Sequence, residues 1–332
     1  MTAPGNRDGS RRRRLSPLAV IVLQRLGMSL LLLVAVSLMI FVGVQLLPGD
    51  FAKTYLGQAA TPQAVANLRA DLGLDRPLMA RYLDWVTGAL RGDFGTSWAS
   101  GLPVSGQIAD RLGNSLFLAG VAALISIPLA VTLGMVSVLY RDRFIDRAIN
   151  VLSLAAISLP EFFVGYLLIL VFAVKTGIAT FPATVHAAMG LGERLATVAL
   201  PVATMVLVVL AHMMRMTRAA IISVMSSAYM ETATLKGLSR ARAILRHAAP
   251  NAIAPIVNVI ALNLAYLIVG VVVVEVVFVY PGMGQYLVDA VMVRDMPVVL
   301  ACGMIFASVY IVLNMIADLI AILANPRLRY PR

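Results

Sequence analysis

The sequence predicts an all-α polytopic membrane protein, on the basis of its composition, its long uncharged runs and the placement of its basic residues. Of the 332 residues, 60% are hydrophobic and only 13% are charged, and the mean hydropathy is +0.89. A soluble domain usually has about 25% charged residues. Because about 20 apolar residues are needed to cross the hydrocarbon of a bilayer as a helix, the long uncharged runs indicate how many spans there are.

Six apolar runs are long enough to cross a bilayer. Five of them contain no charged residue, and the third is interrupted only by Glu161. A single intramembrane acid is compatible with a span, although such residues often have a functional role. We therefore expect six transmembrane helices, at residues 26–49, 112–140, 148–174, 195–214, 248–274 and 296–317.

The basic residues indicate the orientation of these spans, because cytoplasmic connections carry an excess of Lys and Arg. With the N-terminus inside, four cytoplasmic segments hold 18 of the 27 basic residues (six, three, six and three), and the external segments hold nine, accompanied by ten acids. Both termini are therefore expected to be cytoplasmic. The net charge of +11 reflects this topology and contact with anionic membrane lipid, and does not indicate binding of nucleic acid.

The first span and the loop after it have distinct features. The first run is much longer than the apolar core of about 7–15 residues in a signal peptide, so we expect a retained anchor. The loop up to residue 111 is expected to form short helices, the first capped by Thr61 and beginning at Pro62. Tyr82 and Trp85, on the second loop helix, are interpreted either as an interfacial aromatic belt or as a docking surface for an external partner. The single cysteine, Cys302, excludes an internal disulfide.

The connection between the fourth and fifth spans predicts a short helix, a corner and a second helix. Gly237 permits a sharp turn, and Ser239 is placed as the N-cap of the second helix. At 100° per residue, the second helix carries an apolar stripe with basic neighbours on both sides. Such a helix could lie flat on anionic lipid, or insert a small apolar knob into a pocket of another protein. The stripe consists of Ala241, Ile244, Leu245 and Ala248, and it is flanked by Arg240, Arg242, Arg246 and His247.

This connection resembles the EAA loop of bacterial ABC importer permeases. The spacing Glu231-x-Ala233-x-x-x-Gly237, followed by His247 and Pro250, is similar to that loop. In that family the loop forms a coupling helix that lies in a groove of the ATPase subunit. The usual alanine is replaced by threonine at position 232, and Ala-Pro replaces the more common Leu-Arg at 249–250.

The resemblance extends over nearly the whole chain and is closest to dipeptide/oligopeptide permeases (DppB/OppB-like). Its motifs are "LLPGD" at 46–50, "LGLDRPLMARYLDWVTGALRGDFGTSW" at 72–98, "KGLSRARAILRHAAPNA" at 236–252, "EVVFVYPGMGQYLVDAVMVRDMPVV" at 275–299 and "NPRLR" at 325–329. The resemblance implies the type I ABC importer transmembrane fold in the bacterial cytoplasmic (inner) membrane. The parts would be a basic tail (1–25), the first span with an extracytoplasmic helical loop (26–111), a five-helix permease core (112–323) with its coupling loop (215–249), and a cytoplasmic tail (324–332).

The resemblance also implies partners. These are a homologous second permease subunit, two ABC ATPase subunits and an extracytoplasmic solute-binding protein. A phosphate-binding P-loop needs a lysine directly after a glycine, and no lysine in this sequence follows one. We therefore expect no enzyme activity and no cofactor on this chain, with ATP and Mg²⁺ on the ATPase subunits. The residues expected to couple to an ATPase are Tyr229, Glu231, Ala233, Gly237, Ser239, Arg240, Arg242, Leu245, Arg246 and His247.

Two further places are candidates for the path or its gate. Glu161 follows Pro160 and, in a straight helix, would lie about 20 Å along the third span, near the middle of the bilayer. It is interpreted either as a residue of the path or as a protonated or hydrogen-bonded group between helices. Tyr280, Pro281 and Gly282 are expected to form a type II turn, in an external gate or in a plain loop. The three histidines lack ligand spacing, so no metal site is expected.

The expected function is the permease subunit of an ATP-driven, binding-protein-dependent importer that forms half of the path for di- and oligopeptides. Nickel complexes, glutathione or another small solute are alternative cargoes. A proton-coupled secondary transporter would usually contain an internal repeat and several buried ionisable groups, and a membrane enzyme would need clustered catalytic groups. Neither pattern is present. Near the inner end of the last span, Asp318 is expected to pair with Arg327 or Arg329.

Overall fold

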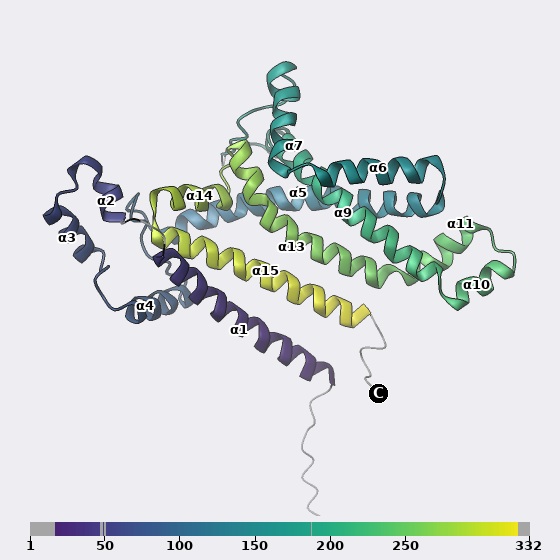
Figure 1. Ribbon diagram of the computed structural model, residues 1–332, viewed down its shortest axis with the longest axis horizontal. Coiled ribbons are helices and arrows are strands. Elements are labelled where there is room, and N and C mark those ends of the chain that lie inside the picture. The colour runs from purple at the N-terminus through teal and green to yellow at the C-terminus, as the bar shows by residue number, and fades with distance from the viewer. Residues whose placement is uncertain (1–16, 47–48, 50, 187, 325–332) are drawn as a thin grey trace, which may run out of the picture.

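The computed structural model describes residues 17–46, 49, 51–186 and 188–324 (Figure 1). Most of the basic tail, most of the "LLPGD" motif and the C-terminal "NPRLR" motif lie outside the described residues. Within the described ranges the protein is helical, apart from an isolated bridge between Thr96 and Pro103. Five of the described helices are long and apolar enough to cross a membrane, and a bent helix pair gives a sixth.

The five long helices run roughly side by side along the longest axis of the molecule (Figure 1). Several extend past the predicted spans, because a helix continues through charged residues once it leaves the apolar layer. For example, the second long helix begins before Arg111, and the third continues through Arg215 and Arg218. The long helices are α1 (Pro17–Gln45), α5 (Val104–Leu139), α9 (Ala199–Met225), α13 (Ile253–Phe278) and α15 (Met296–Ala324).

The third predicted span is not a continuous helix. It consists of α6 (Phe144–Ser158) and of α7 (Glu161–Leu168) with a π-helix (Ile169–Lys175), and the two parts are bent by 100° relative to each other. Pro160 lacks a backbone N–H and disfavours the helical conformation in the residue before it. Leu159 is accordingly extended, with φ −92° and ψ 132°. Glu161 therefore begins a new helix, and the mid-span position calculated for a straight helix is wrong.

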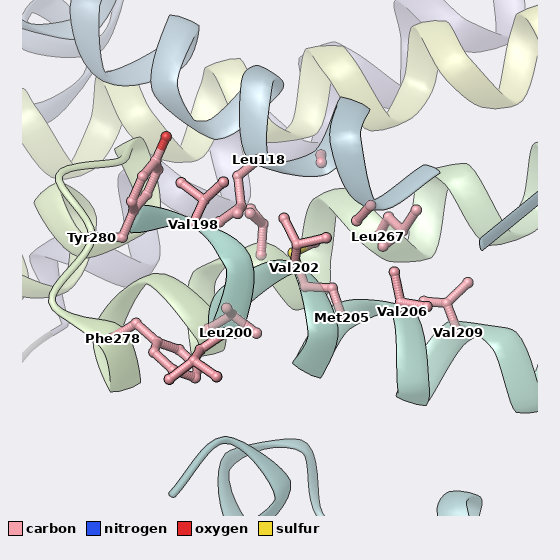
Figure 2. Close-up of a cluster of buried hydrophobic side chains, with 14 of the residues drawn as sticks. Leu118, Val198, Leu200, Val202, Met205, Val206, Val209, Leu267, Phe278 and Tyr280 are labelled. Carbon is pink, nitrogen blue, oxygen red and sulfur yellow. The ribbon is translucent and has the colours of Figure 1, made fainter. Parts of the chain in front are cut away.

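The core of the molecule lies where α5, α9 and α13 meet, and α5 packs most extensively on α9. Figure 2 shows Leu118 of α5, Val202 and Met205 of α9 and Leu267 of α13 in one buried cluster. Between helices in a bilayer such contacts stabilise through close packing, because lipid tails are as apolar as leucine. The remaining elements near this core are α8 (Leu191–Thr197) and α14 (Met283–Val293).

The first helix, α1, packs mainly on α15. At the inner ends of the two helices, the Arg25 guanidinium lies 2.5 Å from the Asp318 carboxylate. The partner of Asp318 in the structure is thus Arg25, because α1 and α15 are antiparallel neighbours. The predicted partners, Arg327 and Arg329, lie outside the described residues.

The external loop contains α2 (Phe51–Leu56), a 3₁₀ turn (Gly57–Ala59), α3 (Pro62–Asp71) and α4 (Leu78–Leu90). The predicted cap is confirmed, since the Thr61 hydroxyl accepts a hydrogen bond from the Ala64 amide at 3.3 Å. On α4 the Tyr82 hydroxyl lies 2.8 Å from the Ser37 hydroxyl of α1, and Trp85 packs on the same apolar cluster. Both aromatic residues are thus partly buried against their own chain. Neither the aromatic belt nor the docking surface that the sequence suggested includes such packing.

Candidate functional site

The connection between α9 and α13 forms a compact unit at the inner end of the molecule, far from α2–α4 (Figure 1). We call residues 228–251 the cytoplasmic segment. It contains α10 (Ala228–Leu235), α11 (Arg240–Ala243), a π-helix, η3 (Ile244–Ala248), and α12 (Ala249–Asn251). This is the segment in which the sequence predicts the coupling residues.

The corner of the cytoplasmic segment has a backbone conformation that favours glycine. Gly237 has φ +79°, in the left-handed region. The Leu238 amide donates to the Ala233 carbonyl at 3.3 Å, which is the 6→1 hydrogen bond of a Schellman motif at the end of a helix. Ser239 occupies the predicted N-cap position of α11, but its side chain makes no capping hydrogen bond.

The inner face of the segment is packed against its own chain. Ile244 and Ala248 are buried in a cluster with Met230, Val138 of α5 and Ile221 of α9. Both interpretations of the apolar stripe, contact with lipid and contact with another protein, require it to face away from its own chain, and this is wrong for two of its four residues. The estimate of 100° per residue fails here because η3 is a π-helix, whose i→i+5 hydrogen bonds widen the turn.

The outer face of the segment presents apolar side chains among charged ones. Leu235 is 83% exposed, Leu245 51% and Tyr229 46%. Leu235 is not among the site residues that the sequence predicts, and its exposure is visible only in the structure. Four exposed charged residues surround these side chains, namely Glu231, Lys236, Arg242 and Arg246. None of the four forms an ion pair with any residue that the structure describes.

Arg240 has a different role from the other cations. Its Nη2 donates to the Val138 carbonyl, at 3.3 Å, near the C-terminal end of α5. A basic side chain is favourable at this end of a helix, where carbonyl groups lack intrahelical partners. Arg240 therefore ties the cytoplasmic segment to α5 of its own chain.

A buried ion pair joins α9 to α6 near the same end of the bundle. Arg218 donates from Nη2 and Nε to the two Asp146 oxygens, at 2.9 and 3.0 Å. The carboxylate also accepts from the Ser137 hydroxyl of α5, the Asp142 amide and the Asn150 side chain. The side chain of Asp146 is only 5% exposed. In the sequence, the one signal of this pair is an acid in the first turn of α6, where a negative charge favours the helix.

At the external end, a buried carboxylate organises the turn between α13 and α14. Gly282 has φ −96° and ψ −177°, so the predicted type II turn, which needs a positive φ at this position, is wrong. A Cβ at Gly282 would lie 2.1 Å from Cδ of Glu275, so glycine is needed for close approach. Glu275 accepts hydrogen bonds from the Gly284 and Gln285 amides at 2.6 and 3.1 Å and from the Ser115 hydroxyl at 2.5 Å.

Tyr280 and Pro281 are also fixed in place, so the motif is not a plain loop. Burial raises the pKa of Tyr280, and its protonated hydroxyl donates to the Asn114 carbonyl at 3.0 Å. The Asn114 side chain donates to the Pro281 carbonyl at 2.9 Å and accepts from Arg194 at 2.7 Å. These contacts hold α5, α13 and the segment before α9 together on the external side.

The predicted site residues thus fall into separate groups. The coupling residues lie together at the inner end, and Tyr280, Pro281 and Gly282 lie beyond the outer end of α13. Glu161 lies beside α13, where a Cβ at Gly270 would be 3.3 Å from both of its carboxylate oxygens. Among the described residues there is no cluster of three His, Cys, Asp or Glu side chains suited to a metal ion.

Two family models match the chain. The model of the binding-protein-dependent transport system inner membrane component matches residues 126–330, and that of the N-terminal part of such membrane components matches residues 18–119. Together with the helical bundle, these matches define a multi-pass inner membrane permease. The chain belongs to the family of binding-protein-dependent transport system inner membrane components, which are the permeases of ABC importers.

Individual relatives cover almost the full length. A probable peptide ABC transporter permease protein, y4tP, of Sinorhizobium fredii is 34% identical over 94% of this chain and all of its own length. The glutathione transport system permease protein GsiC of Salmonella choleraesuis is 36% identical over 93% of this chain and 98% of its own length. The Escherichia coli GsiC protein is 36% identical over 89% of this chain and 94% of its own length.

Proposed function

We propose that this chain forms half of the translocation path of an ATP-driven importer, beside a homologous second permease. Two ABC ATPase subunits would bind on the cytoplasmic side and a solute-binding protein on the outside. The chain itself would bind no cofactor, and ATP and Mg²⁺ would bind to the ATPase subunits. The family membership supports this assembly, and the exposed surface of the cytoplasmic segment is the observation that carries the coupling role.

That surface has the properties of a docking site for a groove in another protein. Leu235 and Leu245 supply exposed apolar side chains. Arg242 and Arg246 are exposed and form no ion pair with a residue that the structure describes, and they supply a basic rim. Interfaces typically concentrate their binding energy in a few such anchors. A groove with an apolar floor and acidic edges on the ATPase would complement them. The alternative, a helix lying flat on lipid, is less suited to a segment that buries Ile244 in its own chain.

The packing of the segment supports transmission of a rigid movement. Buried contacts join it to α5 and α9, and Arg240 adds a hydrogen bond to the end of α5. A shift of the ATPase grooves would therefore move the inner ends of these helices together, as in other rigid-body transitions. ATP-driven closure would open the path to one side, and hydrolysis would reverse it.

For the cargo, we propose di- and oligopeptides. A full-length relative is named as a probable peptide permease, and other relatives are named for glutathione, which makes glutathione the second candidate. Nickel complexes and other small solutes are further alternatives. In the experiment, labelled dialanine and labelled glutathione are offered separately to the reconstituted complex, and the uptake of each is measured. Uptake of glutathione without uptake of any dipeptide would replace the peptide assignment.

The coupling role is tested by reversing one charge. Arg242→Glu should reduce ATP-driven uptake by about tenfold or more, because close charge pairs across an interface often contribute 1.5 kcal/mol or more. Arg141→Glu, which changes an exposed cation in the α5–α6 connection, is the matched control and should leave uptake unchanged.

The energy source is tested separately. ATP depletion with an intact proton gradient should stop uptake. Continued uptake under that condition would indicate a proton-coupled transporter instead.

A further inference from the structure

A pocket lies between the external loop and the outer end of α15, far from the cytoplasmic segment. Its volume is about 640 Å³. Residues of α3, α4 and the 93–101 turn form its walls, and Met296, Pro297 and Leu300 of α15 contribute the remaining apolar side. The aromatic lining includes Trp85 and Trp98, which are the two tryptophans of the sequence.

The frame of the pocket is fixed by a buried carboxylate. Asp295, only 2% exposed, accepts a hydrogen bond from the Ser97 hydroxyl at 2.5 Å. It also accepts from the Trp98 and Ala99 amides, both at 3.2 Å. These bonds attach the turn to the first residues of α15, so the walls are held in place before any ligand binds. Such preorganisation reduces the cost of binding.

One wall of the pocket offers hydrogen-bond donors that the chain uses poorly. Among the described residues, the Arg81 guanidinium donates only to the Gln45 side chain and to the Leu74 carbonyl, both at 3.4 Å, which is long for such bonds. Behind this wall, Nε1 of Trp85 and Nε2 of Gln45 have no hydrogen-bond partner among the described residues, but both atoms are inaccessible from the pocket. A ligand with acceptor oxygens would instead satisfy the N–H groups of Arg81 that the described residues leave unused.

The charge of Arg81 is also not balanced by a neighbouring acid among the described residues. Burial, together with the neighbouring charges of Arg69 and Arg76, lowers the pKa of Arg81. Arg76 is neutralised by Asp84 at 2.7 Å, whereas no acid forms an ion pair with Arg81 among the described residues. A carboxylate would bind here by charge-assisted hydrogen bonds, which are stronger than neutral ones.

Acidic groups on the same lining argue against a purely anionic ligand. Asp71 and Asp93 both line the pocket, and Asp93 has one carboxylate oxygen committed to the Gly95 amide at 2.9 Å. An ammonium group could therefore bind within the same pocket as the carboxylate. The pocket thus combines a cationic wall, acidic positions and aromatic surfaces.

We propose that this pocket binds a small zwitterionic peptide on the external side of the permease. The peptide carboxylate binds Arg81, the ammonium group lies toward Asp71 and Asp93, and an apolar side chain contacts Trp98. The choice of a peptide, rather than another zwitterion, rests on the proposed cargo. The pocket would hold peptide at the outer surface, at a place separate from the path between two permeases.

The test uses the intrinsic fluorescence of the two tryptophans. The full chain is placed in phosphatidylcholine nanodiscs, without ATPase or binding protein, and titrated with dialanine, which does not fluoresce. We expect a saturable change in tryptophan emission. Dialanine amide, which lacks the carboxylate, should bind about tenfold or more weakly, because the charge-assisted bond is lost. N-acetyl-dialanine, which lacks the ammonium group, should also bind more weakly.

Arg81→Gln should abolish the saturable change, whereas Arg91→Gln, at the exposed end of the same helix and outside the pocket, should retain it. If Arg81→Gln does not fold, Arg81→Lys serves as the second variant and should weaken binding, since lysine keeps the charge but lacks the planar fork of guanidinium donors. Equal binding of dialanine and its amide, or no response to any peptide, would overturn the proposal. A response only when phosphatidylethanolamine replaces phosphatidylcholine would identify a lipid headgroup as the ligand instead. A complex that transports peptide but gives no fluorescence response would overturn this site and leave the proposed function intact.

Discussion

The Glu275 carboxylate, buried within the chain, fixes the geometry of the external turn. It lies at the end of α13 and accepts two backbone amides at the start of α14, where a negative charge is favoured by the helix dipole. The Ser115 hydroxyl connects the same carboxylate to α5, and it also accepts from the Met283 amide at 2.8 Å. Three helices therefore depend on one side chain, and a glycine at position 282 makes room for it.

Gly282→Ala should destabilise the folded protein by roughly 1–3 kcal/mol, the usual cost of overpacking a filled site. The new Cβ would overlap the Glu275 carboxyl group and force it to move. Thermal unfolding of the purified protein in detergent measures the effect. Gly106→Ala, in the first turn of α5 with no neighbouring atom within 4 Å of the added Cβ, is the matched control and should be neutral or slightly stabilising.

The elements at the inner end are tied together by a polar contact rather than by apolar packing alone. The Arg218–Asp146 pair connects α9 with α6, and the Ser137 hydroxyl adds α5. The cytoplasmic segment packs on α5 and α9 beside this pair. Because removal of one partner leaves the other charge buried, such a pair makes the arrangement of the helices specific.

Asp146→Asn should destabilise the protein by roughly 1.5–3 kcal/mol, since the Arg218 guanidinium, which is 24% exposed, would lose its charged hydrogen-bond partner. The double variant Asp146→Asn with Arg218→Gln should be less destabilised than the sum of its single variants, because the two residues act as a pair. Urea or thermal unfolding of all three variants gives the coupling energy. Additive effects would contradict the pair. Arg215→Gln, an exposed residue of the same helix, should have no measurable effect.

The corner of the cytoplasmic segment gives a prediction for transport. Proline fixes φ near −65°, so Gly237→Pro cannot adopt the observed +79° and should abolish uptake while membrane insertion continues. Gly237→Asn should keep much of the uptake, because asparagine tolerates the left-handed region better than other residues. Uptake by the reconstituted complex is measured for both variants, with protein amount in the membrane as the control. Full uptake by the proline variant would contradict a role for the corner.

Glu231→Lys, which reverses an exposed charge, should also abolish uptake.

For the molecule as a whole, the arrangement of the helices places α2–α4 and the cytoplasmic segment at opposite ends (Figure 1). The positive charges of the connections orient these ends in the membrane. The native Cys302 is fully buried, so it should give little background in labelling experiments. The chain is therefore well suited to mapping with single introduced cysteines.

Ala66→Cys, on exposed α3, should react with a membrane-impermeant maleimide in intact spheroplasts. Ala241→Cys, on exposed α11, should react only after the membrane is permeabilised. Mass spectrometry of the labelled protein measures both reactions. The reverse pattern would show that the chain is inserted with the opposite orientation.

The sequence alone predicts the helical bundle and several of the helix ends. Uncharged runs located all five long helices, Thr61 located the start of α3, and Gly237 located the corner. Hydrophobicity could not reveal the bend at Pro160, since a broken helix and a straight one have the same apolar composition. Nor could it show whether Ile244 faces a partner or the chain itself, because both environments are apolar.

The polar contacts within the chain were the least predictable part. Asp295 receives hydrogen bonds from residues almost 200 positions earlier in the chain, and no local pattern connects such groups. The same limit applies to Glu275 with Ser115 and to Arg218 with Asp146. Spacing in a sequence reports neighbours on one helix, whereas these contacts depend on how different helices are placed together.

The attachment of the 93–101 turn to Asp295 has a mechanical consequence. Through that carboxylate, this turn is attached to the start of the last helix, and that helix packs against the first one. Force applied to this turn from outside, for example by an arriving carrier protein, would therefore reach α15 and α1 through Asp295. It would also reach α5, because the turn is continuous with that helix and the Val104 amide donates to the Gly95 carbonyl at 3.0 Å. The outer surface is thus mechanically coupled both to the edge of the bundle and to its core.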